Sequence, residues 1–106
     1  MNIPKKIKIG GHWVEIKYPY IFQERFDRFG QCDDPKKIIY ITDKDGNGEK
    51  RANSSIIVTF IHEILHELDY HTGWEIFSGE DGEKKVEGLS EAIYMFLIDN
   101  KFLKEP

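Results

Sequence analysis

Residues 54 to 71 read SSIIVTFIHEILHELDYH, and this stretch decides the architecture of the chain. Asn53, Ser54 and Ser55 offer N-cap side chains at its start, and Gly73 follows its end, as is typical of helix termini. Its apolar residues recur at helical spacing, so one stripe should face a core: Ile57, Ile61, Ile64 and Leu68. A long amphipathic helix is therefore predicted over about residues 54 to 71.

The sequence before this helix alternates apolar and polar residues, as strands do. Residues 5 to 18 carry this alternation on both sides of Gly10-Gly11, which can form a two-residue turn. The turn predicts a register in which both apolar faces coincide, with Ile9 opposite His12 and Ile7 opposite Val14. An antiparallel hairpin is therefore predicted.

Two further elements complete the fold prediction. Residues 37 to 42 are rich in β-branched side chains and predict a third strand, whereas residues 20 to 35 show no clear periodicity. An acidic, glycine-containing loop over 78 to 82 should lead into a second helix over about 83 to 102, with this buried face: Val86, Leu89, Ile93, Phe96 and Leu97. The order predicts an α+β fold, a sheet of about three strands followed by two helices.

Length and composition restrict the class of protein. With 106 residues, 40% of them apolar, the chain is predicted to form one domain over residues 1 to 106. A formal net charge of −4 argues against a nucleic-acid groove, and no apolar run is long enough to cross a membrane. The N-terminus lacks the apolar segment of a secretory signal, and the lone Cys32 excludes an internal disulfide. A cytoplasmic protein is expected, with its oligomeric state open.

The string His62-Glu63-Ile64-Leu65-His66 lies within the first predicted helix. Residues four apart on a helix lie about 40° from each other, so both imidazoles can bind one zinc ion through bonds of about 2.0–2.1 Å. Glu63 lies on the flank of that face, where its carboxylate can take a proton from a water that zinc activates. Two ordinary surface or core histidines are the alternative, which their position beside the apolar stripe disfavours. We predict one zinc ion per chain, with His62 and His66 as ligands and Glu63 as catalytic base.

Catalytic zinc usually has three protein ligands, so a third is needed. His71 would point about 180° from His62 if the helix continues, and we reject it. Asp69 is expected to cap the helix or support a ligand. Glu83 and Glu87 share one face of the second helix; alone, both suit a helix N-terminus as ordinary acids. Beside an incomplete zinc site, a glutamate of the second helix becomes the favoured third ligand.

These residues resemble the gluzincins, metallopeptidases with His-Glu-x-x-His on one helix and a ligand glutamate on the next. More closely, the chain is similar to minimal zincin domains of phages and mobile elements, related to the ImmA/IrrE-type metallopeptidases. The similar stretches are IPKKIKIGGHWVEI, the turn at 30–33, the strand at 38–41, HEILHELDY and EKKVEGLSEAIYMFLIDN. The resemblance implies Glu83 as the third ligand, with Glu87 as an outer acidic residue or alternative ligand. It also implies a peptide laid in extended form on strand 38–41.

The resemblance thus implies a zinc-dependent metallopeptidase that hydrolyses protein or peptide substrates, with Glu63 as general base. Several side chains are candidates for stabilising the transition state, with none preferred: His12, Tyr70, His71 and Tyr94. The alternative function is a non-catalytic, zinc-holding module on a zincin scaffold that binds a protein without cleaving it. A structural zinc site of that kind would be closed by a fourth protein ligand.

Residues 43 to 48, DKDGNG, copy the first half of a calcium-binding loop. Position 12 of such a loop should be glutamate but is Ser54, and the preceding segment is predicted as a strand. A solvated loop is therefore preferred over a calcium site.

Overall fold

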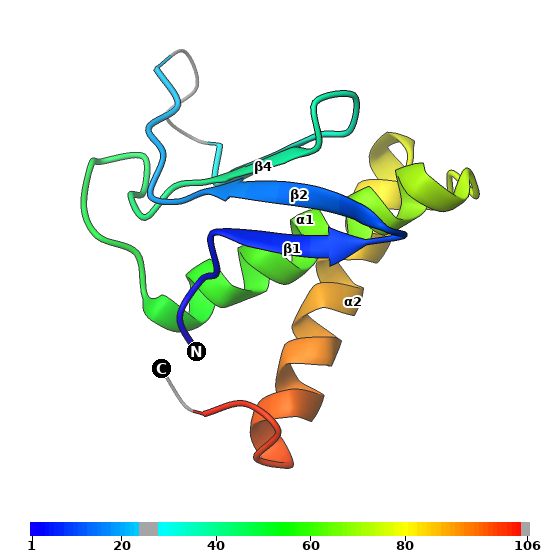
Figure 1. Cartoon of the computed structure of the whole chain (residues 1–106). Helices are drawn as coiled ribbons and strands as arrows, with labels where there is room; N and C mark the ends of the chain where they lie inside the picture. The colour runs from blue at the N-terminus through cyan, green and yellow to red at the C-terminus, as the bar shows by residue number, and fades with distance from the viewer. Residues whose placement is uncertain (24–27, 105–106) are drawn as a thin grey trace.

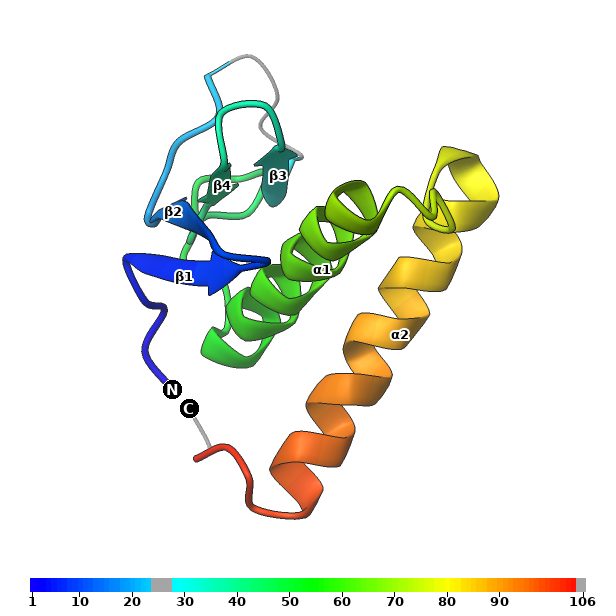
Figure 2. The same cartoon turned by 45° about the vertical axis from the view of Figure 1, so that its right-hand side comes forward.

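The computed structural model describes residues 1–23 and 28–104 and has the α+β architecture that the sequence predicts. Its elements are β1 (Lys6–Ile9), β2 (His12–Lys17), β3 (Gly30–Asp33), β4 (Ile38–Ile41), α1 (Asn53–Thr72) and α2 (Gly79–Asp99). Helix α1 lies between the sheet and α2 (Figure 1, Figure 2). Residues 24–27, within the stretch that lacks periodicity, and 105–106 lie outside the described residues. No helix in the described part of the chain is long and apolar enough to cross a membrane.

The β1–β2 hairpin has the predicted register. Ile9 lies opposite His12 and Ile7 lies opposite Val14, in an antiparallel pair. Gly10 and Gly11 have φ angles of 58° and 82°, the left-handed values that a two-residue turn of this kind requires. The hairpin prediction is confirmed.

The sheet contains a fourth strand, β3, where the resemblance implies a turn. Strands follow the order β1-β2-β4-β3, with β2 and β4 parallel and the other pairs antiparallel. β3 has the short polar sequence GQCD, which gives no apolar alternation to reveal it. The expectation that residues 38–41 form an open rim is wrong, because β4 is paired on both sides. Among the described strands, β1 and β3 are the edges of the sheet.

The core lies between α1 and the sheet. Its buried side chains come from three strands and the first half of α1: Ile9, Val14, Ile16, Ile39, Ile41, Ile56 and Phe60. Along α1 the buried stripe continues from Phe60 to Glu63 and Glu67, which are 6% and 1% exposed. The predicted stripe is therefore only partly right: Ile57 is buried, but Leu68 is exposed. Two carboxylates take the positions next to the sheet.

Buried Glu67 has polar partners that offset the cost of desolvating it. Its Oε1 accepts a hydrogen bond from Lys37 Nζ at 3.0 Å, and its Oε2 accepts one from Cys32 Sγ at 3.2 Å. Lys37 Nζ also lies 2.6 Å from Asp34 Oδ1. These contacts raise the pKa of Lys37, through Asp34 first and then Glu67. Burial and the bond to Glu67 raise the pKa of Cys32 well above its usual range. The cluster fastens β3 and the β3–β4 connection to α1.

Replacing Glu67 with glutamine is expected to lower the free energy of unfolding by about 2 kcal/mol. Breaking a fully buried ion pair costs about 3–5 kcal/mol. The cost is smaller here because Lys37 is 26% exposed and keeps Asp34. Urea unfolding of the metal-free protein measures the difference. Asp34→Asn is the matched control, since it removes the more exposed partner and should cost less than about 1 kcal/mol. Equal losses would contradict this role of Glu67.

The helix ends differ from the sequence prediction at two places. Gly73 ends α1 in the left-handed conformation as predicted, but Ala52 is the N-cap and no side chain caps α1 there. α2 begins at Gly79 instead of about residue 83, so most of the predicted loop is helical. Gly82 packs against the backbone of Phe77, where a Cβ would collide.

The buried face of α2 is narrower than predicted. Of the predicted positions, Val86 is buried, whereas Leu89 and Phe96 are exposed. Gly82, Val86 and Ser90, each four residues apart, form the buried line. Since α2 packs mainly on α1, one helical stripe is enough to cover its contact.

Candidate metal centre

His62 and His66 project from neighbouring turns of α1 on the side that faces α2. Their ring centroids lie 4.9 Å apart, and both rings are largely shielded from solvent. Burial lowers the pKa of His66, with Glu83 opposing the shift and His62 adding to it. Lowering this pKa favours the neutral imidazole, which is the form that binds metals.

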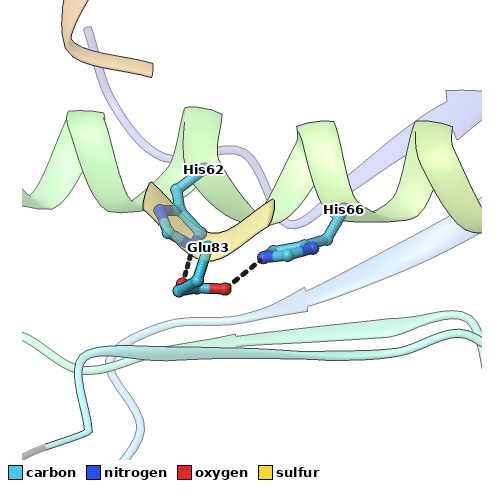
Figure 3. A group of neighbouring side chains, drawn as sticks. All are labelled: His62, His66 and Glu83. Atoms are coloured by element: carbon cyan, nitrogen blue, oxygen red, sulfur yellow. Dashed lines mark hydrogen bonds and ion pairs between the residues drawn. The ribbon is translucent and has the colours of Figure 1, made fainter. Parts of the chain in front are cut away.

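Glu83 extends from α2 between the two imidazoles (Figure 3). Its Oε1 lies 2.8 Å from His62 Nε2, and its Oε2 lies 3.2 Å from His66 Nε2. One ligand atom from each residue can be chosen so that all three lie within 4.8 Å of one another. In a tetrahedral zinc site with bonds of about 2.0–2.1 Å, neighbouring ligand atoms lie about 3.3 Å apart. The donor set and its spacing therefore fit a zinc ion after small side-chain shifts.

The structure distinguishes Glu83 from Glu87. Glu83 contacts both histidines, while Glu87 lines the cleft further along α2. Among the described residues no hydrogen bond joins the Glu87 carboxylate to either imidazole, so the alternative that Glu87 is the third ligand is not favoured. His71 lies apart from the group, against Gly10 and His12 at the tip of the β1–β2 hairpin.

Glu63 lies beside His62 but turns towards the sheet. A Cβ on Gly30 of β3 would lie 2.7 Å from Glu63 Oε2, so the absence of a side chain there leaves room for the carboxylate. Burial raises the pKa of Glu63 to about 8, the charge of Glu83 adds to the shift and that of Arg28 opposes it. A buried carboxyl with such a pKa can both take and return a proton near neutral pH.

Asp69 holds the connection between the helices. Its carboxylate accepts hydrogen bonds from the backbone N–H groups of Ile76 and Phe77, both at 3.0 Å. The expected helix cap is not what is seen, because Ile76 and Phe77 precede Ser78, the N-cap of α2; Asp69 instead fixes the chain just before α2 and Glu83. Phe77 in turn approaches the His66 ring edge-on, with centroids 6.3 Å apart.

Of the candidates for stabilising the transition state, only Tyr70 lines the cleft around the site. Its ring stacks beside His66, with centroids 6.1 Å apart and an interplanar angle of 20°. Burial raises the pKa of Tyr70, and the nearby charges of Cys32, Glu63, Asp69 and Glu83 raise it further. A hydroxyl that stays protonated can donate a hydrogen bond.

His62, His66 and Glu83 line a cleft of about 1400 Å³. β3 forms one wall, α1 the floor, and α2 the opposite wall. Sequence reasoning missed several residues that line it: Arg28, Gly30, Arg51 and Thr59. These residues can be assigned to the cleft only once the position of β3 is known, and the sequence of β3 has no apolar alternation that predicts a strand.

The loop over residues 43–48 contributes Asp45 to the cleft lining, and Asp45 Oδ1 accepts hydrogen bonds from the backbone N–H groups of Asn47 and Glu49.

Comparisons with protein-family models, with curated proteins and with solved structures found no match. Function must therefore be inferred from the chemistry of the site.

Proposed function

We propose that this protein is a zinc-dependent metallopeptidase, with zinc held by His62, His66 and Glu83. The observation that carries the proposal is that Glu83 reaches both imidazoles from a second helix while Glu63 lies beside them at the cleft. When bound, zinc supplies a Lewis acid that makes water a better nucleophile and polarises a carbonyl group.

The residues of the chain would divide the remaining work. Glu63 takes a proton from the attacking water and returns it to the leaving amine, which a pKa near the working pH favours. Tyr70 is placed to donate a hydrogen bond to a negatively charged oxygen from the rim of the cleft. The half-buried surroundings strengthen these interactions by excluding part of the solvent.

A peptide in extended form could bind along the β3 wall of the cleft. The wall contains the edge strand β3, which can pair with an added strand through its free backbone groups. Gly30 in this strand lies directly against Glu63, so a peptide aligned on β3 would pass next to the base. In this proposal β3 takes the place that the resemblance implied for residues 38–41.

The number of ligands supports catalysis over a purely structural zinc site. Within residues 1–23 and 28–104, His62, His66 and Glu83 form the metal-capable group, and no fourth side chain joins them. A structural zinc site is closed by four protein ligands, whereas a catalytic site keeps one position for water.

Removal of zinc provides the direct test. Zinc-loaded protein, with about one zinc per chain, is expected to cleave members of a pool of N-acetylated, C-amidated peptides. Treatment with a chelator should abolish cleavage, and one equivalent of zinc should restore it. Mass spectrometry of the peptides reports new termini. Zinc binding without any cleavage would favour the non-catalytic binding module.

Gly30→Ala is expected to lower kcat at least tenfold while zinc content stays at about one per chain. The new methyl group would lie 2.7 Å from Glu63 Oε2 and 2.8 Å from Thr59 Cγ2, so the carboxylate must move. A displacement of about 1 Å at a reacting group can cost about a hundredfold in rate. Gly88→Ala, on the α2 wall of the cleft, is the matched control, because φ there is not left-handed and a Cβ meets no atom within 4 Å. Unchanged kcat in Gly30→Ala would contradict the close contact.

A further inference from the structure

Arg51 lines the cleft and is held in place by hydrogen bonds to three residues. Its Nη1 donates a hydrogen bond to the Thr42 carbonyl oxygen at 3.0 Å, and its Nη2 donates to Thr59 Oγ1 at 2.7 Å and to the Ser55 carbonyl oxygen at 3.3 Å. The Phe29 ring covers one face, 4.2 Å from Arg51 Cζ. Such fixation means that little further side-chain entropy is lost when a ligand binds.

The guanidinium has no carboxylate partner among the described residues. All three bonds go to neutral oxygens, and Arg51 forms no ion pair with any described residue. These three hydrogen bonds leave two of the five guanidinium N–H donors for a ligand. Burial lowers the pKa of Arg51, although the group remains protonated at neutral pH. A partly desolvated cation without a partner gains most from an incoming anion.

Arg51 is also close to the reacting groups. Its hydrogen-bond partner Thr59 precedes Glu63 by one helical turn, about 6 Å along α1. A Cβ built on Gly30 would lie 2.7 Å from Glu63 Oε2 and 2.8 Å from Thr59 Cγ2, so both side chains approach Gly30. Since an extended peptide advances about 3.3 Å per residue, the rise of about 6 Å along α1 corresponds to about two residues.

Charges differ between the two walls of the cleft. Arg28, Lys50 and Arg51 lie on the β3 side, whereas α2 contributes Glu83, Glu87 and Glu91, with Lys84 as its one cation among the described lining residues. Asp45 is the acidic exception on the β3 side, and its Oδ1 is already engaged by backbone N–H groups. An anionic group in the cleft is therefore favoured on the side of Arg51.

We infer that Arg51 forms a specificity subsite for an acidic side chain of the peptide, within about three residues of the bond that is cleaved. This inference rests on the proposed peptidase function and adds the substrate class: extended peptides with aspartate or glutamate near the cleavage point. Arg51 binds the carboxylate through its charge and its remaining N–H donors, while β3 carries the peptide backbone.

The test uses a positional library of N-acetylated, C-amidated octapeptides in which aspartate or asparagine occupies one position at a time. Zinc-loaded wild type should favour aspartate at least tenfold in kcat/KM at one position, which is about 1.4 kcal/mol. The ratio should fall towards one in Arg51→Gln and recover only in part in Arg51→Lys, which keeps the charge but not the fork. Lys84→Gln, which removes a cation from the α2 wall, should leave the ratio unchanged.

Binding provides a readout that does not depend on cleavage. Zinc-loaded Glu63→Gln protein is expected to bind the aspartate peptide at least tenfold more tightly than the matching asparagine peptide. This difference in affinity should become smaller at high salt, which screens the attraction between charges. Cleavage without a preference for acidic residues would overturn the inference and leave the peptidase proposal standing. Binding that depends on Arg51, without any cleavage, would support the subsite and overturn the peptidase proposal. A preference for a free C-terminal carboxylate over an internal aspartate would overturn the side-chain assignment.

Discussion

Glu63→Gln is expected to keep about one zinc per chain and to lower peptide hydrolysis by about 10³-fold. Glutamine has nearly the same shape as glutamate but cannot take a proton, and general base catalysis contributes about 10²–10⁴-fold. Glu63 is outside the group formed by His62, His66 and Glu83, so its replacement leaves the donors of the metal in place. Metal analysis and kcat/KM on one cleaved peptide measure the two effects separately.

The stability of the metal-free Glu63→Gln protein guards against the trivial explanation that the variant unfolds. Folding raises the pKa of Glu63 from 4.5 to about 8, so the folded state keeps this proton when the unfolded state has lost it. Wild type therefore loses stability as the pH rises from about 4.5 to about 8. The variant has no such loss and should be more stable at pH 8, by on the order of 4 kcal/mol. Activity equal to wild type would contradict the mechanism.

The first helix and its histidines could be predicted because helical geometry relates them locally. Residues four apart share a face whatever the rest of the chain does, so His62 and His66 needed no tertiary information. Glu83 depended on how α2 packs against α1, which the sequence does not specify. Several glutamates of α2 had similar spacing, and only the structure shows that Glu83 contacts both imidazoles.

The misplaced face of α1 has a physical origin. A pattern of apolar residues assumes that charged side chains avoid the core, but Glu63 and Glu67 both lie next to the sheet. Glu67 is stabilised there by Lys37 and Cys32, both distant in sequence. Among the described residues no hydrogen bond or ion pair to Glu63 is found, and burial raises its pKa, which is common at functional sites. The prediction thus failed at the part of α1 where the proposed chemistry lies.

The cleft was hidden from the sequence for a related reason. β3 is a short polar strand, and it forms the wall that brings Gly30 to Glu63. Arg51 precedes α1 by two residues and belongs to no sequence motif, yet its guanidinium donates a hydrogen bond to Thr59 on the helix. Substrate contacts of this kind depend on pairings between distant segments, whereas the metal donors of α1 follow from spacing alone.

Glu83→Gln is expected to weaken zinc binding by more than about 100-fold. The carboxylate contacts both imidazoles, so the substitution removes an anionic donor from a three-residue site. Loss of a residue that only supports a ligand typically costs 10–100-fold, and loss of the ligand itself should exceed this. Competition with a chromophoric chelator at fixed pH gives the two affinities.

Glu87→Gln is the matched control, because it removes the same charge one turn further along α2 and also faces the cleft. Its zinc affinity should fall less than tenfold, since no hydrogen bond joins its carboxylate to either imidazole within the described residues. Both glutamates lie beyond the first turn of α2, so a helix-dipole effect should be small in both variants. A larger loss in Glu87→Gln than in Glu83→Gln would show that the third ligand had been misassigned. Retention of full affinity in both would leave two histidines alone, too few for the zinc site proposed.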